Sequence, residues 1–118
     1  MKTEKMKDGK NILFVCSANI NRSTTAELWF AWRNPENKYS SAGSSQFACR
    51  KYGGNYVTEK QLQEADRIVC MENRNKAEIK KQFGSSYSNK IQVAGIPDKY
   101  SFMELPLIFE CIDKITIE

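Results

Sequence analysis

The chain has 118 residues, of which 41% are hydrophobic and 27% are charged, so it is long enough to form one globular domain with a buried core. Its net charge of +4 is too small to indicate a nucleic-acid-binding protein, and no apolar run approaches the length of a membrane span. The Lys-rich start lacks the apolar segment of a signal peptide. We therefore expect a flexible basic leader at residues 1–10, a single domain at residues 11–118 and a cytoplasmic location.

The cysteine and histidine content argues against several kinds of site. The chain has no histidine, and no Cys-x2-Cys pair occurs among Cys16, Cys49, Cys70 and Cys111. Zinc binding and catalysis by serine–histidine or cysteine–histidine pairs are therefore disfavoured, and we expect neither a metal nor a cofactor. In a reducing compartment the thiols should stay free rather than form disulfides.

Short strands and helices alternate in the predicted secondary structure. Runs rich in β-branched and aromatic residues predict strands at residues 12–15, 38–42, 67–71 and 90–94. Capping residues and apolar spacing predict helices at residues 23–33, 58–65, 73–83 and 103–115. Residues 44–55 have the composition of a loop. This alternation predicts an α/β fold, in which a four-stranded parallel, doubly wound sheet is flanked by helices on both faces.

Particular residues are expected to set the helix boundaries. Thr58 and Asn73 should cap the second and third helices, and Gly84 should end the third. Pro106 is tolerated because it lies in the first turn of the last helix. Apolar residues at helical spacing predict that this helix faces the core through Leu105, Ile108, Phe109, Ile112 and Ile115.

The clearest chemical signal lies where the first strand joins the first helix. The strand ends in Cys16, a polar loop follows at residues 17–21, and Arg22 precedes the helix. Loop amides that lead into a helix N-terminus form an anion site, and a guanidinium can hold two phosphate oxygens at once. A thiol in such a positive field ionises more readily than a free thiol and becomes a nucleophile. Asp98 follows the fourth strand, so it should reach the same edge of the sheet as Cys16.

These residues resemble the low-molecular-weight protein tyrosine phosphatases. The family's signature is a strand, then Cys-x4-Cys-Arg-Ser with an asparagine inside the loop, and the chain is similar to it in Cys16, Asn19, Ile20, Arg22 and Ser23. Segments similar to the family's second-strand end, third strand and acid loop occur at residues 41–43, 65–71 and 96–100. The compact size and the Ile-Pro-Asp-x-Tyr loop most resemble a small branch of predicted tyrosine phosphatases from bacteria and phages.

The sequence departs from the family pattern at three positions in or beside the predicted site. Asn21 replaces the second loop cysteine, so the family's internal disulfide cannot form there. Ala18 replaces a loop glycine, and Lys99 replaces the proline that follows the acidic residue.

The resemblance implies a phosphatase that hydrolyses phosphotyrosine-type aryl phosphate monoesters through a cysteinyl-phosphate intermediate. Cys16 would be the nucleophile, Arg22 would hold the phosphate oxygens and Asp98 would be the general acid. The phosphate would lie in the loop formed by Ser17, Ala18, Asn19, Ile20, Asn21, Arg22 and Ser23. Phe47 and Tyr100 would form the walls that hold the aromatic ring. The implied partner is a phosphorylated protein or a small aryl phosphate, with inorganic phosphate as product and no part for nucleic acid or a membrane.

Two alternatives stay open on the sequence alone. A weakly active or inactive protein could keep the loop and bind phosphate or phosphoproteins without efficient turnover. An arsenate reductase-like enzyme would share the fold and the loop, but it needs two further cysteines for a disulfide relay. Only Cys70 lies near the predicted site.

Overall fold

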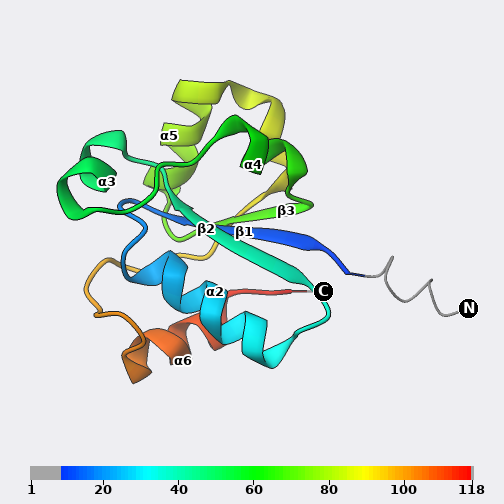
Figure 1. Cartoon of the computed structure of the whole chain (residues 1–118), viewed down its shortest axis with the longest axis vertical. Helices are drawn as coiled ribbons and strands as arrows, with labels where there is room; N and C mark the ends of the chain where they lie inside the picture. Colours follow the sequence, from blue (N-terminus) through cyan, green and yellow to red (C-terminus); the bar gives the residue numbers. More distant parts are fainter. Residues whose placement is uncertain (1–8, 118) are drawn as a thin grey trace, which may run out of the picture.

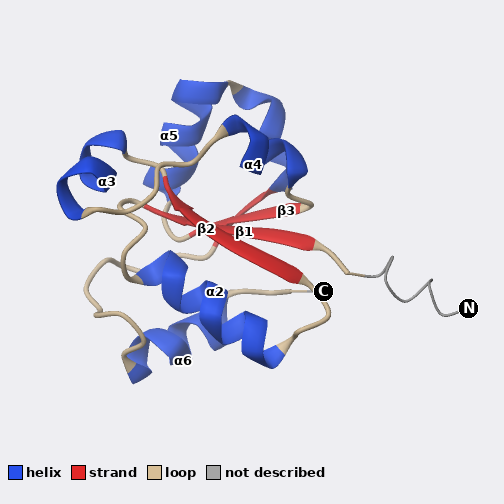
Figure 2. Ribbon diagram, in the orientation of Figure 1, coloured by secondary structure: helices blue, strands red, loops and turns tan. Residues whose placement is uncertain are grey.

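A parallel sheet of four strands separates two helical layers in the computed structural model, which describes residues 9–117 (Figure 1, Figure 2). The strands are β1 (Asn11–Cys16), β2 (Lys38–Gly43), β3 (Arg67–Cys70) and β4 (Ile91–Val93). They pair in the order β2-β1-β3-β4, with every pairing parallel. The predicted fold class is therefore confirmed. Residues 1–8 of the expected leader lie outside the described residues.

The helices divide between the two faces of the sheet, as a doubly wound fold requires. They are α2 (Arg22–Arg33), α3 (Gln46–Tyr52), α4 (Glu59–Glu64), α5 (Asn73–Phe83) and α6 (Leu105–Lys114), with a 3-10 helix η1 at Ser85–Lys90. Figure 1 shows α2 and α6 on one side of the sheet and α4 and α5 on the other. No helix among residues 9–117 is long and apolar enough to cross a lipid bilayer.

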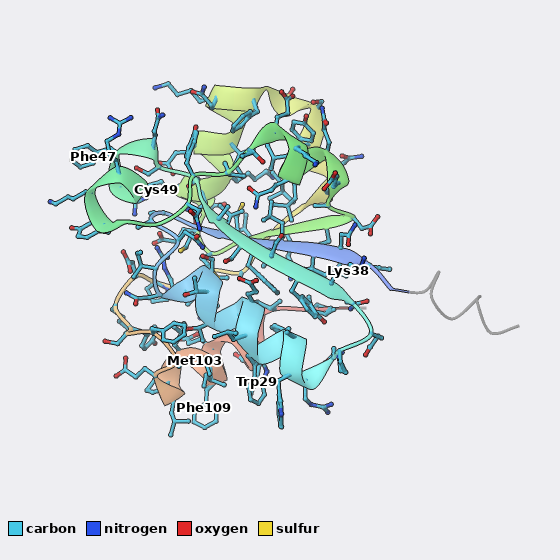
Figure 3. The ribbon with its side chains drawn as sticks, in the orientation of Figure 1. Trp29, Lys38, Phe47, Cys49, Met103 and Phe109 are labelled. Carbon is cyan, nitrogen blue, oxygen red and sulfur yellow. The ribbon has the colours of Figure 1, made fainter. Side chains whose placement is uncertain are left out.

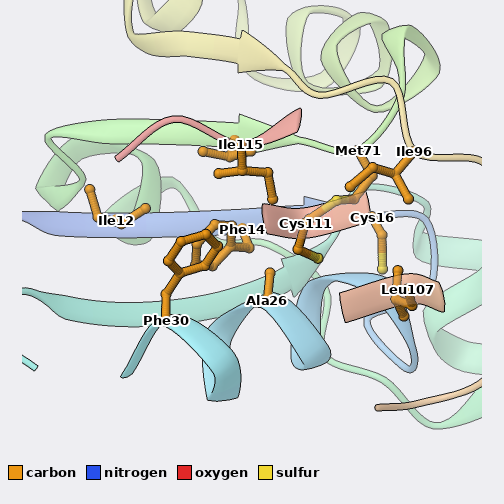
Figure 4. Packing of buried hydrophobic residues seen from close by; sticks show 11 residues of the cluster. Ile12, Phe14, Cys16, Ala26, Phe30, Met71, Ile96, Leu107, Cys111 and Ile115 are labelled. Carbon is orange, nitrogen blue, oxygen red and sulfur yellow. The ribbon is translucent and has the colours of Figure 1, made fainter. Parts of the chain in front are cut away.

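The central strand β1 builds a core on both faces, because successive side chains of a strand point to opposite sides. Phe14 and Cys16 pack into the cluster beneath α2 and α6, which also contains Phe30 and Leu107 (Figure 4). The intervening Val15 packs into the second cluster, on the side of α4 and α5. The strand is thus buried on both faces, which explains its continuous apolar sequence.

Helix α3 corrects the prediction of a loop at residues 44–55. Its first turn is capped by Ser45, whose side-chain oxygen accepts a hydrogen bond of 3.1 Å from the backbone N–H of Ala48. Gly53 ends the helix in a left-handed conformation, with a φ of 86°. Cys49 is the one buried residue of this seven-residue helix, so the sequence has no apolar stripe that would reveal it.

The boundaries of α4 and α5 are close to those predicted. Thr58 caps α4, as expected, through a capping box with Gln61. Gly84 ends α5, but the N-cap is Glu72 rather than Asn73. The backbone N–H of Glu72 donates a 2.9 Å hydrogen bond to Oδ1 of Asn75, which fixes the start of the helix one residue earlier.

Helix α6 faces the core with only part of the apolar side that the sequence predicted, since Ile108 and Ile115 are buried as expected. Leu105, Phe109 and Ile112 are 64%, 62% and 51% exposed, although the apolar spacing assigned them to the core. The side that is buried consists of Leu107, Ile108, Cys111 and, just after the helix, Ile115. The helix carries apolar residues on two adjoining sides, and periodicity alone does not tell which of them meets the sheet.

Candidate active site

A pocket of about 190 Å³ lies at the carboxyl end of the sheet, where parallel sheets commonly bind ligands. It is lined by Cys16, Ala18, Ile20, Asn21, Arg22, Tyr52 and Asp98. Five of these belong to the predicted loop or flank it, from Cys16 to Arg22, and Asp98 comes from the segment after β4. The fold therefore brings together the three side chains for which the sequence predicts catalysis.

The sulfur of Cys16 lies at hydrogen-bonding distance from a hydroxyl group. Cys16 is buried at the end of β1, and its Sγ is 3.1 Å from Oγ of Ser23, in the first turn of α2. Oγ of Ser23 also accepts a 2.9 Å hydrogen bond from Nδ2 of Asn19. A hydroxyl group can accept one hydrogen bond and donate another, so Ser23 can accept from Asn19 and donate to the sulfur, a bond that would stabilise a thiolate at Cys16.

Asn19 holds the loop in shape through its side chain and its backbone. Its φ of 61° lies in the left-handed region, which asparagine tolerates better than other residues with a Cβ. Besides the bond to Ser23, Nδ2 donates to Oγ of Ser41 at 3.0 Å, and Oδ1 accepts from the backbone N–H of Asn55 at 3.3 Å. Ala18 does not have a positive φ, so the loss of the family's glycine there imposes no backbone strain.

Two glycines allow neighbouring segments to pack directly against the loop. A Cβ on Gly54 would lie 1.7 Å from the carbonyl oxygen of Ala18, and a Cβ on Gly43 would lie 2.7 Å from that of Ser17. Neither position has room for a side chain. The end of β2 and the segment after α3 thus form a tight wall behind the loop.

Helix α5 supports the loop through Ser17, an arrangement that the sequence did not predict. Oγ of Ser17 accepts hydrogen bonds from Nη2 of Arg74 at 3.1 Å and from Nδ2 of Asn75 at 3.3 Å. Asn75 is fully buried and also donates to Oγ of Ser44 at 3.0 Å. Arg74 and Asn75 lie in the first turn of a helix with a polar, charged sequence, so no local pattern distinguishes them from ordinary surface residues.

Arg22 joins the loop to the ends of two other strands. Its side chain is 1% exposed, and Nη1 donates to the carbonyl oxygen of Ile96 at 2.9 Å. The same nitrogen is 2.9 Å from Oε1 of Glu72, just after β3, while Nη2 is 3.6 Å from Oδ2 of Asp98. A buried guanidinium needs such partners, and they orient it towards the pocket that it lines. Glu72 is a further site residue that the sequence did not single out.

The aromatic side chain in the pocket is not one of the two predicted. Phe47 is 75% exposed on α3 and does not line the pocket (Figure 3). Tyr100 packs against the core and donates its hydroxyl to Oε2 of Glu110 at 2.8 Å, so it too lies outside the pocket lining. Tyr52, at the end of α3, does line it. No local sequence pattern pointed to Tyr52, because residues 44–55 were predicted as a loop, and a loop does not place its side chains.

The other three cysteines are buried and do not line the pocket, although Sγ of Cys49 donates a 3.7 Å hydrogen bond to the carbonyl oxygen of Ser17 behind the loop. Burial raises the pKa of Cys70 and of Cys111 to about 12, and it also raises the pKa of Cys49. All four cysteines are free thiols. Within residues 9–117, no group of three or more acidic or cysteine side chains is placed to bind a metal ion.

The pocket has the composition of an oxyanion site with the thiol of Cys16 at its base. Among residues 9–117, the backbone N–H groups of residues 18–23 donate no hydrogen bond to another protein group. A tetrahedral anion seated in the loop could accept from these amides and from Arg22, with the sulfur of Cys16 beneath it. Asp98 would then stand beside the anion on the open side of the pocket.

Known proteins with this fold are found by comparing structures and not by comparing sequences. No protein-family model matches the chain, and no curated protein matches it. The tyrosine phosphatase Wzb from Escherichia coli K30, solved with phosphate, is 20% identical with a TM-score of 0.70, covering 90% of this chain and 93% of that one. The low-molecular-weight protein tyrosine phosphatase from T. tengcongensis is 24% identical with a TM-score of 0.64, covering 91% and 100%. The chain has the low-molecular-weight phosphatase fold.

The phosphatase fold confirms the resemblance expected from the loop and strand motifs. A YwlE variant from Bacillus subtilis is 25% identical with a TM-score of 0.56, covering 73% of this chain and 72% of that one. Another YwlE structure is of an arginine phosphatase, a cysteine-to-serine variant with a phosphorylated active-site serine. The predicted class, a cysteine-dependent phosphatase, is thus the class of the proteins that share this fold.

Proposed function

We propose that the protein is a phosphatase that hydrolyses aryl phosphate monoesters, such as phosphotyrosine, with Cys16 as the nucleophile. The observation that carries the proposal is the sulfur of Cys16 at a pocket that also receives the guanidinium of Arg22 and the carboxyl group of Asp98. We further propose that the protein acts in the cytoplasm, where its free thiols would stay reduced.

Substrate binding would use the loop amides and Arg22. The three non-bridging oxygens of the phosphate would accept hydrogen bonds from the N–H groups of residues 18–23 and from the guanidinium. The ester oxygen would then point away from the sulfur, towards Asp98. The ring would lie between Tyr52 and Ile20, which supply an aromatic and an aliphatic surface at the pocket.

Two displacements at phosphorus would follow. The thiolate of Cys16 attacks phosphorus, the bond to the ester oxygen breaks, and protonated Asp98 gives its proton to the leaving phenolate. Asp98, now a carboxylate, takes a proton from water, whose oxygen attacks phosphorus and breaks the sulfur–phosphorus bond. The thiolate leaves with the hydroxyl of Ser23 positioned to donate to it, and inorganic phosphate is released. Arg22 would stabilise the charge on the equatorial oxygens in both steps.

Substitution of Cys16 and Asp98 tests this assignment. With p-nitrophenyl phosphate as substrate, Cys16→Ser should abolish turnover while inorganic phosphate still binds in calorimetry. Asp98→Asn should lower turnover by about 10²–10⁴-fold, and by less when the leaving phenol is more acidic and needs no proton. Asp113→Asn, an exposed carboxyl group on α6, is the matched control and should leave turnover unchanged. The rate of the initial phenol burst reports the first displacement alone, so an equal loss of burst rate for acidic and weakly acidic phenols would show that Asp98 is not the acid.

The same assays separate the alternative functions. A protein that binds phosphate without efficient turnover would release at most one equivalent of phenol, in an initial burst. Hydrolysis of phosphoarginine but not of aryl phosphates would move the substrate class to that of the YwlE enzymes and contradict the role given to the aromatic wall.

An arsenate reductase-like relay is disfavoured by the sheet itself. Cys16 packs into the cluster beneath α2 and α6, whereas Cys70 is fully buried in the cluster on the opposite face. A disulfide needs Cβ atoms about 4 Å apart, and the sheet separates these two side chains.

A further inference from the structure

One side of α6 presents apolar residues to solvent. Leu105, Phe109 and Ile112 are spaced by four and three residues, so they share one side of the helix, and each is more than half exposed. This is the side that the sequence pattern assigned to the core. The spacing is that of a helix surface built to pack against another protein element.

The neighbouring helix α2 continues this apolar surface. Leu28 and Trp32 lie one turn apart, and Trp32 is 71% exposed. The ring of Trp32 lies 5.4 Å from the ring of Trp29, which is partly buried against the core cluster. An indole ring has a large apolar area, so it is unfavourable to leave most of the ring exposed to water, as at Trp32.

The two apolar sides belong to one surface. Both helices cover the same core cluster, and the segment before α6 is tied to α2 by a 2.8 Å hydrogen bond from the backbone N–H of Met103 to Oγ1 of Thr25. Figure 3 shows Trp29, Met103 and Phe109 along the same side of the molecule. We call this surface the α2–α6 face, with the exposed residues Leu28, Trp32, Met103, Leu105, Phe109 and Ile112.

The size of the α2–α6 face is that of a dimer interface. Taking about 200 Å² for a fully exposed large apolar side chain, these six residues leave roughly 600–700 Å² of apolar surface in water. The largest apolar patch on a monomeric protein is about 300–600 Å², and a standard interface buries about 800 Å² on each partner. The apolar area of the α2–α6 face is thus larger than the usual apolar patch on a monomer and close to the area that one partner buries in a standard interface.

We propose that the α2–α6 face is the interface of a homodimer in solution. A twofold axis would place α6 of one copy against the same helix of the other, and such an isologous contact requires only one self-complementary surface. None of the six residues lines the pocket, so the dimer would leave the phosphatase site open.

Sedimentation velocity on the full chain, at total concentrations from about 1 to 100 μM, tests the proposal. The wild-type protein should shift from monomer to dimer across this range. Trp32→Glu and Phe109→Glu, separately and combined, should stay monomeric, because a carboxylate would be buried against apolar side chains. Phe47→Glu is the matched control, since Phe47 is equally exposed on α3, away from the face, and should dimerise like the wild type.

Tryptophan fluorescence gives a readout that needs no substitution. The only two tryptophans of the chain, Trp29 and Trp32, both belong to this region, so dimerisation should shift their emission to shorter wavelength as concentration rises. If the protein is a monomer at all concentrations, the proposal is wrong, whatever the wavelength of the tryptophan emission. Dimerisation lost equally in Phe47→Glu would overturn it as well, because the contact would then lie elsewhere.

Discussion

Replacement of Asn19 tests how the loop keeps its shape, and the structure gives the expected magnitude. Asn19→Ala removes three hydrogen bonds, to Ser23, Ser41 and Asn55, each worth about 1 kcal/mol of unfolding free energy. It also leaves a Cβ at a φ of 61° without the local bonding that favours asparagine there, which costs about 1 kcal/mol more. We therefore expect Asn19→Ala to lower the free energy of unfolding by about 4 kcal/mol.

Asn19→Gly separates the two contributions. Glycine loses the same three hydrogen bonds but adopts a φ of 61° without strain, which recovers about 1–2 kcal/mol. The greater freedom of glycine in the unfolded chain takes back about 0.5–1 kcal/mol. Asn19→Gly should therefore be as stable as Asn19→Ala or up to about 1.5 kcal/mol more stable, although both are less stable than the wild type.

Urea unfolding followed by circular dichroism measures these differences, with turnover of p-nitrophenyl phosphate as the functional readout. Both variants should lose turnover, because the hydroxyl of Ser23 is no longer directed at the sulfur of Cys16. Asn73→Ala, at an exposed position, is the control and should change stability by less than about 0.5 kcal/mol. If Asn19→Ala is as stable as the wild type, or clearly more stable than Asn19→Gly, the reasoning about this residue is wrong.

Three further substitutions or treatments test other parts of the site. Gly54→Ala places a Cβ 1.7 Å from a loop carbonyl oxygen and should lower both stability and turnover, whereas Gly53→Ala, with open space around it, should cost only about 1 kcal/mol for its positive φ. Glu72→Gln removes the negative charge beside the buried guanidinium of Arg22 and should lower the melting temperature. The decrease should be smaller when phosphate is present, because the bound anion supplies the missing negative charge, and an equal decrease with and without phosphate would contradict this role of Glu72. Because burial raises the pKa of both Cys70 and Cys111 to about 12, iodoacetamide at pH 8 should alkylate these two thiols only after the protein is unfolded. Mass spectrometry that finds either thiol alkylated in the folded protein would contradict this expectation.

The parts of the fold that could be predicted from sequence are those with a local signal. The strand before Cys16 is buried on both faces, and such strands have continuous apolar sequences. Residues at the ends of parallel strands meet at one edge of the sheet, which is why Cys16 and Asp98 could be brought together before the structure was known. The capping box at Thr58 is likewise a local pattern that the structure contains.

The rest depends on contacts between distant segments, which no local pattern encodes. Tyr52 was missed because α3 is anchored by a single buried cysteine and has no apolar periodicity. Glu72 pairs with Arg22 across fifty positions of sequence, so only the neighbouring ends of β1 and β3 reveal the contact. Leu105, Phe109 and Ile112 of α6 were assigned to the core because the helix has apolar residues on two adjoining sides, and their spacing does not tell which side meets the sheet.

The contacts of Arg22 have a consequence for local motion. β4 is a three-residue edge strand with only half-buried side chains, and such strands are among the first to open in native-state hydrogen exchange. Ile96 and Asp98 follow this strand, and both contact the guanidinium of Arg22. When β4 separates from the sheet, Arg22 would therefore lose the carbonyl oxygen of Ile96, and the pocket would lose the carboxyl group of Asp98, in the same event. Mild denaturant should therefore inactivate the protein before the sheet as a whole unfolds.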